Sequence, residues 1–181
     1  MVFPRRLLGC GTAAATAALA ACSPVHDWRD VRPADTQAVL QFPCRPVLHQ
    51  RTVPLAGPAV QLSLLACTAG GQTWALAHAD LADPLRVGPA LVEMRSSAAA
   101  KLKAIDSPLQ WLAVPGATPN VHSGRGRLGA RPSANAPESG ALQMELLLFA
   151  HGTRVFQASV LGQQLPADEV DTFFASIGFR Q

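Results

Sequence analysis

Residues 142–161, with the sequence LQMELLLFAHGTRVFQASVL, decide the fold class of this chain. Two apolar runs, at 142–150 and 154–161, lie on either side of His151-Gly152. Strand-length apolar runs joined by a short turn that contains glycine are typical of a β-hairpin. The sequence therefore predicts two antiparallel strands here, with the turn at His151-Gly152.

Earlier in the chain, apolar and polar side chains again alternate with the period of a β-strand. We expect a short extended piece and then further strands at residues 27–32, 38–42, 47–55, 59–67, 73–81, 109–114 and 121–128. Proline and glycine residues separate several of these segments, as turns require.

Two helices are expected, one between the strands and one near the C-terminus. Gly88 and Pro89 favour a helix start, because proline has no N–H group to lose at the first helical position. This helix is predicted to run to about Ala104, and the second from about Pro166 to Gly178, a residue typical of helix ends. Their apolar stripes, at three- and four-residue steps, are Leu91, Met94, Ala98 and Leu102, and Val170, Phe173, Phe174 and Ile177. Strands, a helix, more strands and a final helix predict an α+β fold with an antiparallel sheet.

The first 21 residues are typical of an export signal. Arg5 and Arg6 precede an apolar run at 7–20, which is too short to cross a hydrocarbon core of ~30 Å as a helix. The run ends in LAAC at 19–22, which resembles the lipobox of bacterial lipoproteins. That resemblance implies cleavage before Cys22 and fatty acylation of its thiol. An ordinary secretory leader, cleaved after an Ala-x-Ala sequence, is the alternative.

The lipobox and the strand and helix patterns together predict three segments, and the lipobox also implies a location. Residues 1–21 are the lipoprotein signal peptide, residues 22–36 the lipidated cysteine and a tether, and residues 37–181 a single α+β domain. Each buried CH₂ of an acyl chain contributes ~0.8 kcal/mol, so several chains hold a protein on a membrane. We expect the domain to face the periplasm. Ser23, in place of an aspartate after the cysteine, favours the outer membrane over the inner one.

The charge balance excludes one class of partner. The formal net charge is +3 at pH 7, and Arg5 and Arg6 leave with the signal peptide. A nearly neutral mature chain gives no electrostatic reason to expect nucleic-acid binding. With 49% hydrophobic and 15% charged residues, the chain is also unlike a disordered protein.

Two cysteines, Cys44 and Cys67, remain after Cys10 is removed with the signal peptide and Cys22 is acylated. Two thiols in an oxidising compartment predict one disulfide bond. A redox pair would favour a Cys-x-x-Cys spacing, and a zinc site needs about four ligands. Neither pattern is present in the sequence.

Three stretches resemble a group of exported bacterial proteins with the PsbP-like fold: FPCRP at 42–46, GTRVF at 152–156 in the hairpin, and FFASIGF at 173–179. The similarity covers most of residues 37–179. It implies a twisted antiparallel sheet flanked by helices, and it implies no catalytic residue. Phe156 stands where tyrosine is common in the group, and Cys44 stands where glycine is common. Other PsbP-like proteins are binding or assembly subunits, so the resemblance implies a binding role.

A glycine- and arginine-rich stretch follows, GRGRLG at 124–129, which matches G-x-G-x-x-G. A dinucleotide site needs a helix after these glycines, and Pro132 and Pro137 argue against one. Arg125, Arg127 and Arg131 have no acidic neighbour in the sequence. We expect a solvated face that protects a sheet edge, with an anion or lipid-headgroup contact as the alternative.

The remaining polar and aromatic residues give no catalytic pattern. His78 and Asp80 share one face of a strand, but neither H-E-x-x-H nor G-x-S-x-G occurs. We expect no metal, cofactor or catalytic residue. Trp74 and Trp111 are predicted in the core, and Trp28 partly exposed.

The sequence therefore predicts a membrane-anchored, exported lipoprotein that acts as a binding or accessory module in the cell envelope, without catalysis. Its expected partners are the membrane, through the N-terminal lipid, and an envelope protein or lipid. The alternative is a periplasmic carrier of a small molecule or lipid, with a cavity between sheet and helix. A hydrolase ranks third.

Overall fold

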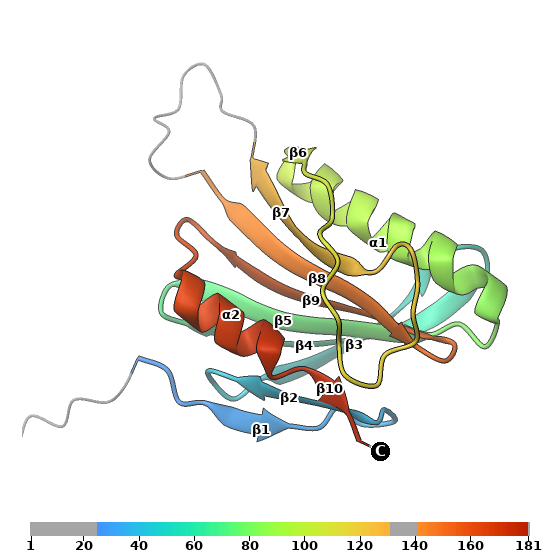
Figure 1. Ribbon diagram of the computed structural model, residues 1–181, viewed down its shortest axis with the longest axis horizontal. Coiled ribbons are helices and arrows are strands. Elements are labelled where there is room, and N and C mark those ends of the chain that lie inside the picture. The colour runs from blue at the N-terminus through green and yellow to red at the C-terminus, as the bar shows by residue number, and fades with distance from the viewer. Residues whose placement is uncertain (1–24, 131–140, 181) are drawn as a thin grey trace, which may run out of the picture.

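A seven-stranded antiparallel sheet forms the centre of the fold, with one α-helix on each face (Figure 1). The computed structural model describes residues 25–130 and 141–180. In spatial order the strands are β3 (Val47–Pro54), β4 (Ala59–Ala69), β5 (Gln72–Asp80), β9 (Arg154–Gly162), β8 (Gln143–His151), β7 (Gly124–Ala130) and β6 (Ala104–Asp106). The antiparallel sheets and the two helices confirm the predicted mixture of helix and sheet.

A smaller three-stranded sheet lies beside helix α2 (Ala167–Ala175). Strand β2 (Ala38–Phe42) pairs with β1 (Arg29–Val31) on one side and with β10 (Gly178–Phe179) on the other. Together with α2 this sheet covers one face of the large sheet. Helix α1 (Val87–Leu102) covers the other face.

The two faces of the large sheet carry side chains of different size. Strand β5 directs Trp74 and Leu76 into the core beneath α2. The alternate residues of β5, which include Ala77 and Ala79, point to the α1 side. Successive side chains of a strand point to opposite faces. Among the described residues, the core beneath α2 contains the buried aromatic rings, and the core beneath α1 is aliphatic.

The central hairpin is confirmed, with its turn displaced by one residue. β8 extends through His151, which pairs with Arg154 at the start of β9, so Gly152 and Thr153 form the turn. The φ angle of Gly152 is 58°, a left-handed value that glycine adopts without steric cost.

The prediction of a strand at 109–114 is wrong. Only Gln110 makes a β-bridge, with Arg125. Leu109 packs in the α1-side core, whereas Leu112 and Val114 pack in the α2-side core. The segment therefore crosses the edge of the sheet instead of extending it.

Trp111 is 63% exposed, so its predicted place in the core is also wrong. Trp74 is buried and Trp28 is half-buried, as expected.

Residues 27–36 belong to the fold rather than to the expected tether. The N–H of Asp27 donates to the carbonyl of Pro43 at 2.8 Å, and Trp28 packs against the core with its ring 5.9 Å from that of Trp74. Strand β1 follows directly and pairs with β2. The folded region consequently starts before residue 37.

Helix α1 begins at Val87, one residue before the expected cap Gly88, because a 3₁₀ turn (Pro84–Arg86) leads into it. The Asp83 carboxylate accepts from the N–H of Leu85 at 2.9 Å and starts that turn. Within the described part of the chain, neither helix is both long and apolar enough to span a membrane.

Candidate functional site

A groove of about 670 Å³ lies between helix α1 and the outer strands of the large sheet. This volume falls within the ~300–1,000 Å³ that is common for small-molecule sites. Strand β3 and helix α1 form its two walls, and strands β4, β5, β8 and β9 contribute its floor. The principal wall residues are His49, Arg51, Val53 and Pro54 from β3, and Glu93, Met94, Ser97, Ala98 and Lys101 from α1.

The groove exists because the sheet is wider than the helix. Helix α1 packs on β6, β7, β8 and β9, which leaves β3 and β4 beyond its edge. Almost every residue of β3 is exposed as a result. The uncovered strip of sheet between β3 and the helix is the floor of the groove.

One row of paired residues shows how the floor is built. His49 pairs with Leu64, Leu64 with Ala77, and Ala77 with Gln157, across β3, β4, β5 and β9. Directly paired residues point to the same face of a sheet. The small side chain of Ala77 keeps the middle of this row low, and Leu62 and Met144 add apolar surface on either side.

One end of the groove is closed by the turn between β3 and β4. The guanidinium of Arg86 donates to four backbone carbonyls, at 2.7–3.1 Å: those of Leu55, Ala56, Pro58 and Leu81. Arginine presents its five donors in a rigid fork, which suits such a cluster of acceptors. The turn, the end of β5 and the start of α1 are thereby held together.

A second contact fixes the same turn to the helix. The N–H of Ala56 donates to Oε2 of Glu93 at 2.7 Å. The two contacts set the separation of β3 from α1 at this end, and with it the width of the groove.

The charges of the groove are mostly positive. Among the described residues that line it, His49, Arg51 and Lys101 are basic and Glu93 is the one acid. Glu93 is engaged by the N–H of Ala56. The side chains of Arg51 and Lys101 have no hydrogen-bond or ion-pair partner within residues 25–130 and 141–180.

The predicted arginine face lies on the opposite side of the sheet and is not free of acids. In the register of β7 and β8, Arg127 is paired with Glu145, and its Nη2 lies 2.9 Å from that carboxylate. Arg125 forms ion pairs with Glu145 and with Asp171, the second at 2.6 Å. Arg125 and Arg127 have no acidic neighbour in the sequence, but the fold brings acidic side chains next to both of them. Arg131 lies outside the described residues.

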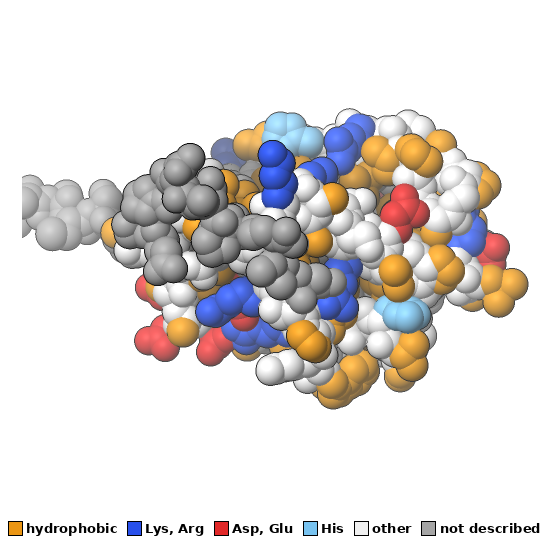
Figure 2. All heavy atoms as spheres, turned by 90° about the horizontal axis from the view of Figure 1, so that it is seen from above, with side chains coloured by type: hydrophobic (Ala, Val, Ile, Leu, Met, Phe, Trp, Pro, Cys, Tyr) orange, Lys and Arg blue, Asp and Glu red, His pale blue; other side chains and the backbone are white. Residues whose placement is uncertain are grey.

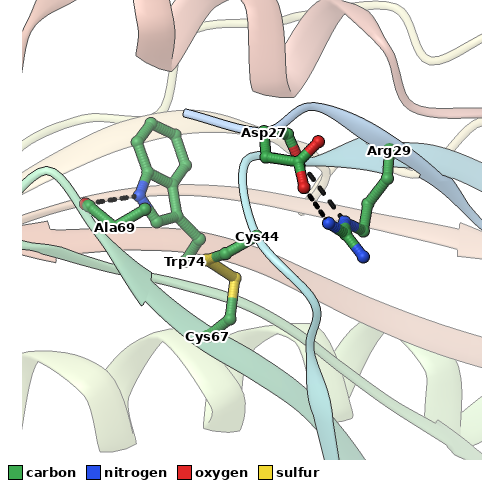
Figure 3. The surroundings of a disulfide bond; sticks show 6 residues. All are labelled: Asp27, Arg29, Cys44, Cys67, Ala69 and Trp74. Atoms are coloured by element: carbon green, nitrogen blue, oxygen red, sulfur yellow. Dashed lines mark hydrogen bonds and ion pairs between the residues drawn. A yellow bond between two sulfur atoms is a disulfide. The ribbon is translucent and has the colours of Figure 1, made fainter. Parts of the chain in front are cut away.

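The predicted disulfide is confirmed. Cys44, after β2, is bonded to Cys67 on β4, with Cα atoms 6.0 Å apart (Figure 3). Cys67 pairs with Trp74 across β4 and β5, and the Trp74 indole N–H donates to the carbonyl of Ala69 at 3.3 Å. The bond therefore fastens the small sheet to the large one beside the main aromatic core. Cys22 lies outside the described residues.

His78 and Asp80 do not form a reactive pair. His78 is buried beside Phe156, and burial, followed by the positive charge of Arg154, lowers its pKa to about 4 against a smaller opposing effect of Asp35. The carboxylate of Asp80 accepts from the Thr153 hydroxyl at 2.7 Å and from Arg154 at 3.0 Å. Hydrogen bonds to the Ala82 N–H and to Thr153 are the main causes that lower the pKa of Asp80. The contacts of both side chains are therefore those of structural residues and not of a catalytic pair.

No cluster of three or more histidine, cysteine, aspartate or glutamate side chains suited to a metal occurs among the described residues. Comparison with protein-family models, with curated proteins and with solved structures finds no match to this chain.

The sequence analysis expected a cavity between sheet and helix as an alternative but did not identify the residues that line it. The signals were present in part. On β3, His49, Arg51 and Val53 alternate with residues of the other face, and on α1, Glu93, Ser97 and Lys101 recur every four residues. Nothing in either pattern tells that the two rows face each other.

Proposed function

We propose that the domain is a binding module that holds an apolar small molecule or lipid in the groove between α1 and the sheet. The groove of about 670 Å³ is the observation that supports this role. Its apolar lining is suited to a hydrocarbon chain, since each buried CH₂ group contributes about 0.8 kcal/mol. Of the two hypotheses from the sequence, the carrier is therefore favoured over the docking module.

A docking surface for an envelope protein has less support. Arg125 and Arg127, two of the three residues proposed for an anion contact, form ion pairs with Glu145, and Arg125 also with Asp171. On the face seen in Figure 2, hydrophobic side chains are interspersed with basic, acidic and uncharged groups. Scattered apolar side chains are ordinary on folded proteins and need no partner.

We also propose that the protein is an exported lipoprotein, acylated at Cys22 and facing the periplasm, with the outer membrane favoured. The leader and its LAAC sequence at 19–22 support this proposal. The Cys44–Cys67 disulfide agrees with it, because such bonds persist in oxidising compartments. The PsbP-like fold remains a proposal that rests on the sequence stretches quoted above. The role is one of binding, without catalysis.

Membrane fractionation tests the anchor. The full chain, expressed with its own leader, is expected in the membrane fraction, and intact mass is expected to show acylation of an N-terminal Cys22. The Cys22→Ala variant is expected to lose both properties. A Cys22→Ala protein that stays membrane-bound would contradict the proposal.

Photo-cross-linking in native envelopes tests the groove. The probe is a long-chain alcohol that carries a diazirine in its chain, and cross-linked peptides are mapped by mass spectrometry. We expect labelling on the peptides that contain Met94 or Met144, which line the groove. Ser97 is exposed and lines the groove, so Ser97→Trp is expected to fill it and to remove this labelling.

Ser96→Trp is the matched control, because Ser96 is also exposed on α1 but is not part of the groove lining. It is expected to leave the labelling unchanged. Labelling confined to other peptides, or equal labelling in both variants, would contradict the proposed role.

A further inference from the structure

The polarity of the side chains that line the groove changes along its length. At the end closed by the β3–β4 turn the groove is lined by Val53, Pro54 and Leu55 from β3 and the following residue. Arg51, which pairs with Leu62 of β4, lines it further along β3. At the other end the polar side chains of His49, Gln157 and Lys101 line it, together with Leu64 and Ala77 of the floor. The direction follows from one contact: Glu93 meets Ala56 at the closed end, and Lys101 lies two turns further along α1, a distance of about 12 Å.

An apolar end and a polar end suit a molecule that itself has two ends. An amphiphile would place its hydrocarbon chain against Val53 and Leu55 and its headgroup toward Arg51 and the open end. A ligand without a polar group would leave Gln157 facing hydrocarbon, and polar groups that lose water without gaining a partner are costly.

The charges determine which headgroup fits. Arg51 on β3 and Lys101 on α1 both line the groove, and neither side chain has a hydrogen-bond or ion-pair partner among the described residues. The acid among the described lining residues, Glu93, is turned to the Ala56 N–H at the closed end. A carboxylate or phosphate between the two cations would gain charge-assisted hydrogen bonds, whereas a cationic headgroup would be repelled.

We infer that the ligand is an anionic amphiphile with a single alkyl chain, whose oxyanion headgroup is bound by Arg51 and Lys101. This inference rests on the proposed function, because it names the class of molecule that the groove accepts. Carboxylate and phosphate headgroups share the chemistry that these two cations recognise, and the experiment separates them.

The experiment compares three diazirine probes with the same alkyl chain, which end in a carboxylate, a phosphate or an alcohol. In the Arg51→Gln/Lys101→Gln variant, groove labelling by at least one anionic probe is expected to fall about tenfold, which corresponds to about 1.4 kcal/mol. Labelling by the alcohol is expected to change little. Arg45 is exposed and does not line the groove, so Arg45→Gln is the control and is expected to leave all three unchanged.

The outcomes separate this inference from the function on which it rests. If all three probes label the groove and the double variant affects them equally, the headgroup assignment is overturned while the groove remains a ligand site. If no probe labels the groove of the wild-type protein, the assignment fails together with the proposed function. Competition on the wild-type protein gives a second measurement that needs no variant: unlabelled carboxylate or phosphate should displace its probe better than the alcohol does, and equal displacement would overturn the inference.

Discussion

Glu93 on helix α1 accepts a hydrogen bond from the backbone N–H of Ala56, with a distance of 2.7 Å between nitrogen and oxygen. The contact fastens the β3–β4 turn to the helix at the closed end of the groove. It also holds the one acid among the described lining residues at that end, about 12 Å along α1 from Lys101. The shape and the charge of the groove therefore depend on the same carboxylate.

Replacing Glu93 tests this contact. Glu93→Ala is expected to lower the free energy of unfolding by about 1–2 kcal/mol, because the Ala56 N–H loses its acceptor. Glu93→Gln retains a side-chain oxygen and is expected to lose less. Chemical denaturation of the three proteins gives the comparison, and equal stability of Ala and wild type would show that the contact is not formed.

Arg86 is expected to be the most sensitive basic residue of the described chain. Arg86→Ala leaves four carbonyls without their donor, so we expect a loss of about 2–4 kcal/mol in the free energy of unfolding. Arg45 is exposed, and Arg45→Ala is expected to change stability by less than about 0.5 kcal/mol. Similar urea midpoints for the two variants would contradict the role given to Arg86.

The Cys44–Cys67 bond closes a loop with a sequence separation of 23 residues. In the chain-entropy model such a loop contributes roughly 3 kcal/mol to stability. Urea unfolding of the oxidised wild type is therefore expected at higher urea than that of the Cys44→Ala/Cys67→Ala variant. Unchanged stability of that variant, or free thiols in unreduced wild-type protein, would argue against a stabilising disulfide.

Acid is expected to destabilise the fold through His78. Its pKa is about 4 in the folded protein, against the ordinary histidine value of 6.5 expected in the unfolded chain. Between these values the unfolded chain binds a proton that the folded protein does not, so stability falls as the pH is lowered from about 6.5 to about 4.

The expected loss from this histidine approaches about 3 kcal/mol at the acid end of that range. His78→Gln cannot bind this proton, so its stability should fall less over the same range. Thermal melting of both proteins at a series of pH values measures the difference. Parallel curves would show that His78 does not titrate as described.

Local patterns in the sequence were sufficient for most of the regular elements, but not for the short strands β6 and β10. The hairpin of β8 and β9, the strand β2 and the apolar stripe of α2 each follow from residues close together in the chain, and Cys44 and Cys67 followed from compartment chemistry. The segment 109–114 shows the limit of such patterns. Its apolar residues alternate as in a strand, but Leu109 and Leu112 are buried in different cores, which alternation alone does not reveal.

The groove could not be predicted from the sequence, because it depends on contacts between residues that lie far apart in the chain. Arg86 reaches carbonyls of the β3–β4 turn about thirty residues earlier in the chain, and this contact sets how far β3 stands from α1. The pairing of Arg127 with Glu145 likewise depends on the register of β7 against β8. In both cases the decisive neighbour is chosen by the tertiary structure.

The most direct test of the account is native mass spectrometry of the full-length gene product purified from envelopes, as wild type, Ser97→Trp and Ser96→Trp. The account predicts that wild type and Ser96→Trp each carry an additional non-covalent mass, released on denaturation and identified as an acidic single-chain amphiphile, and that Ser97→Trp lacks it. A ligand-free wild type, or the same bound mass in all three proteins, would contradict the account.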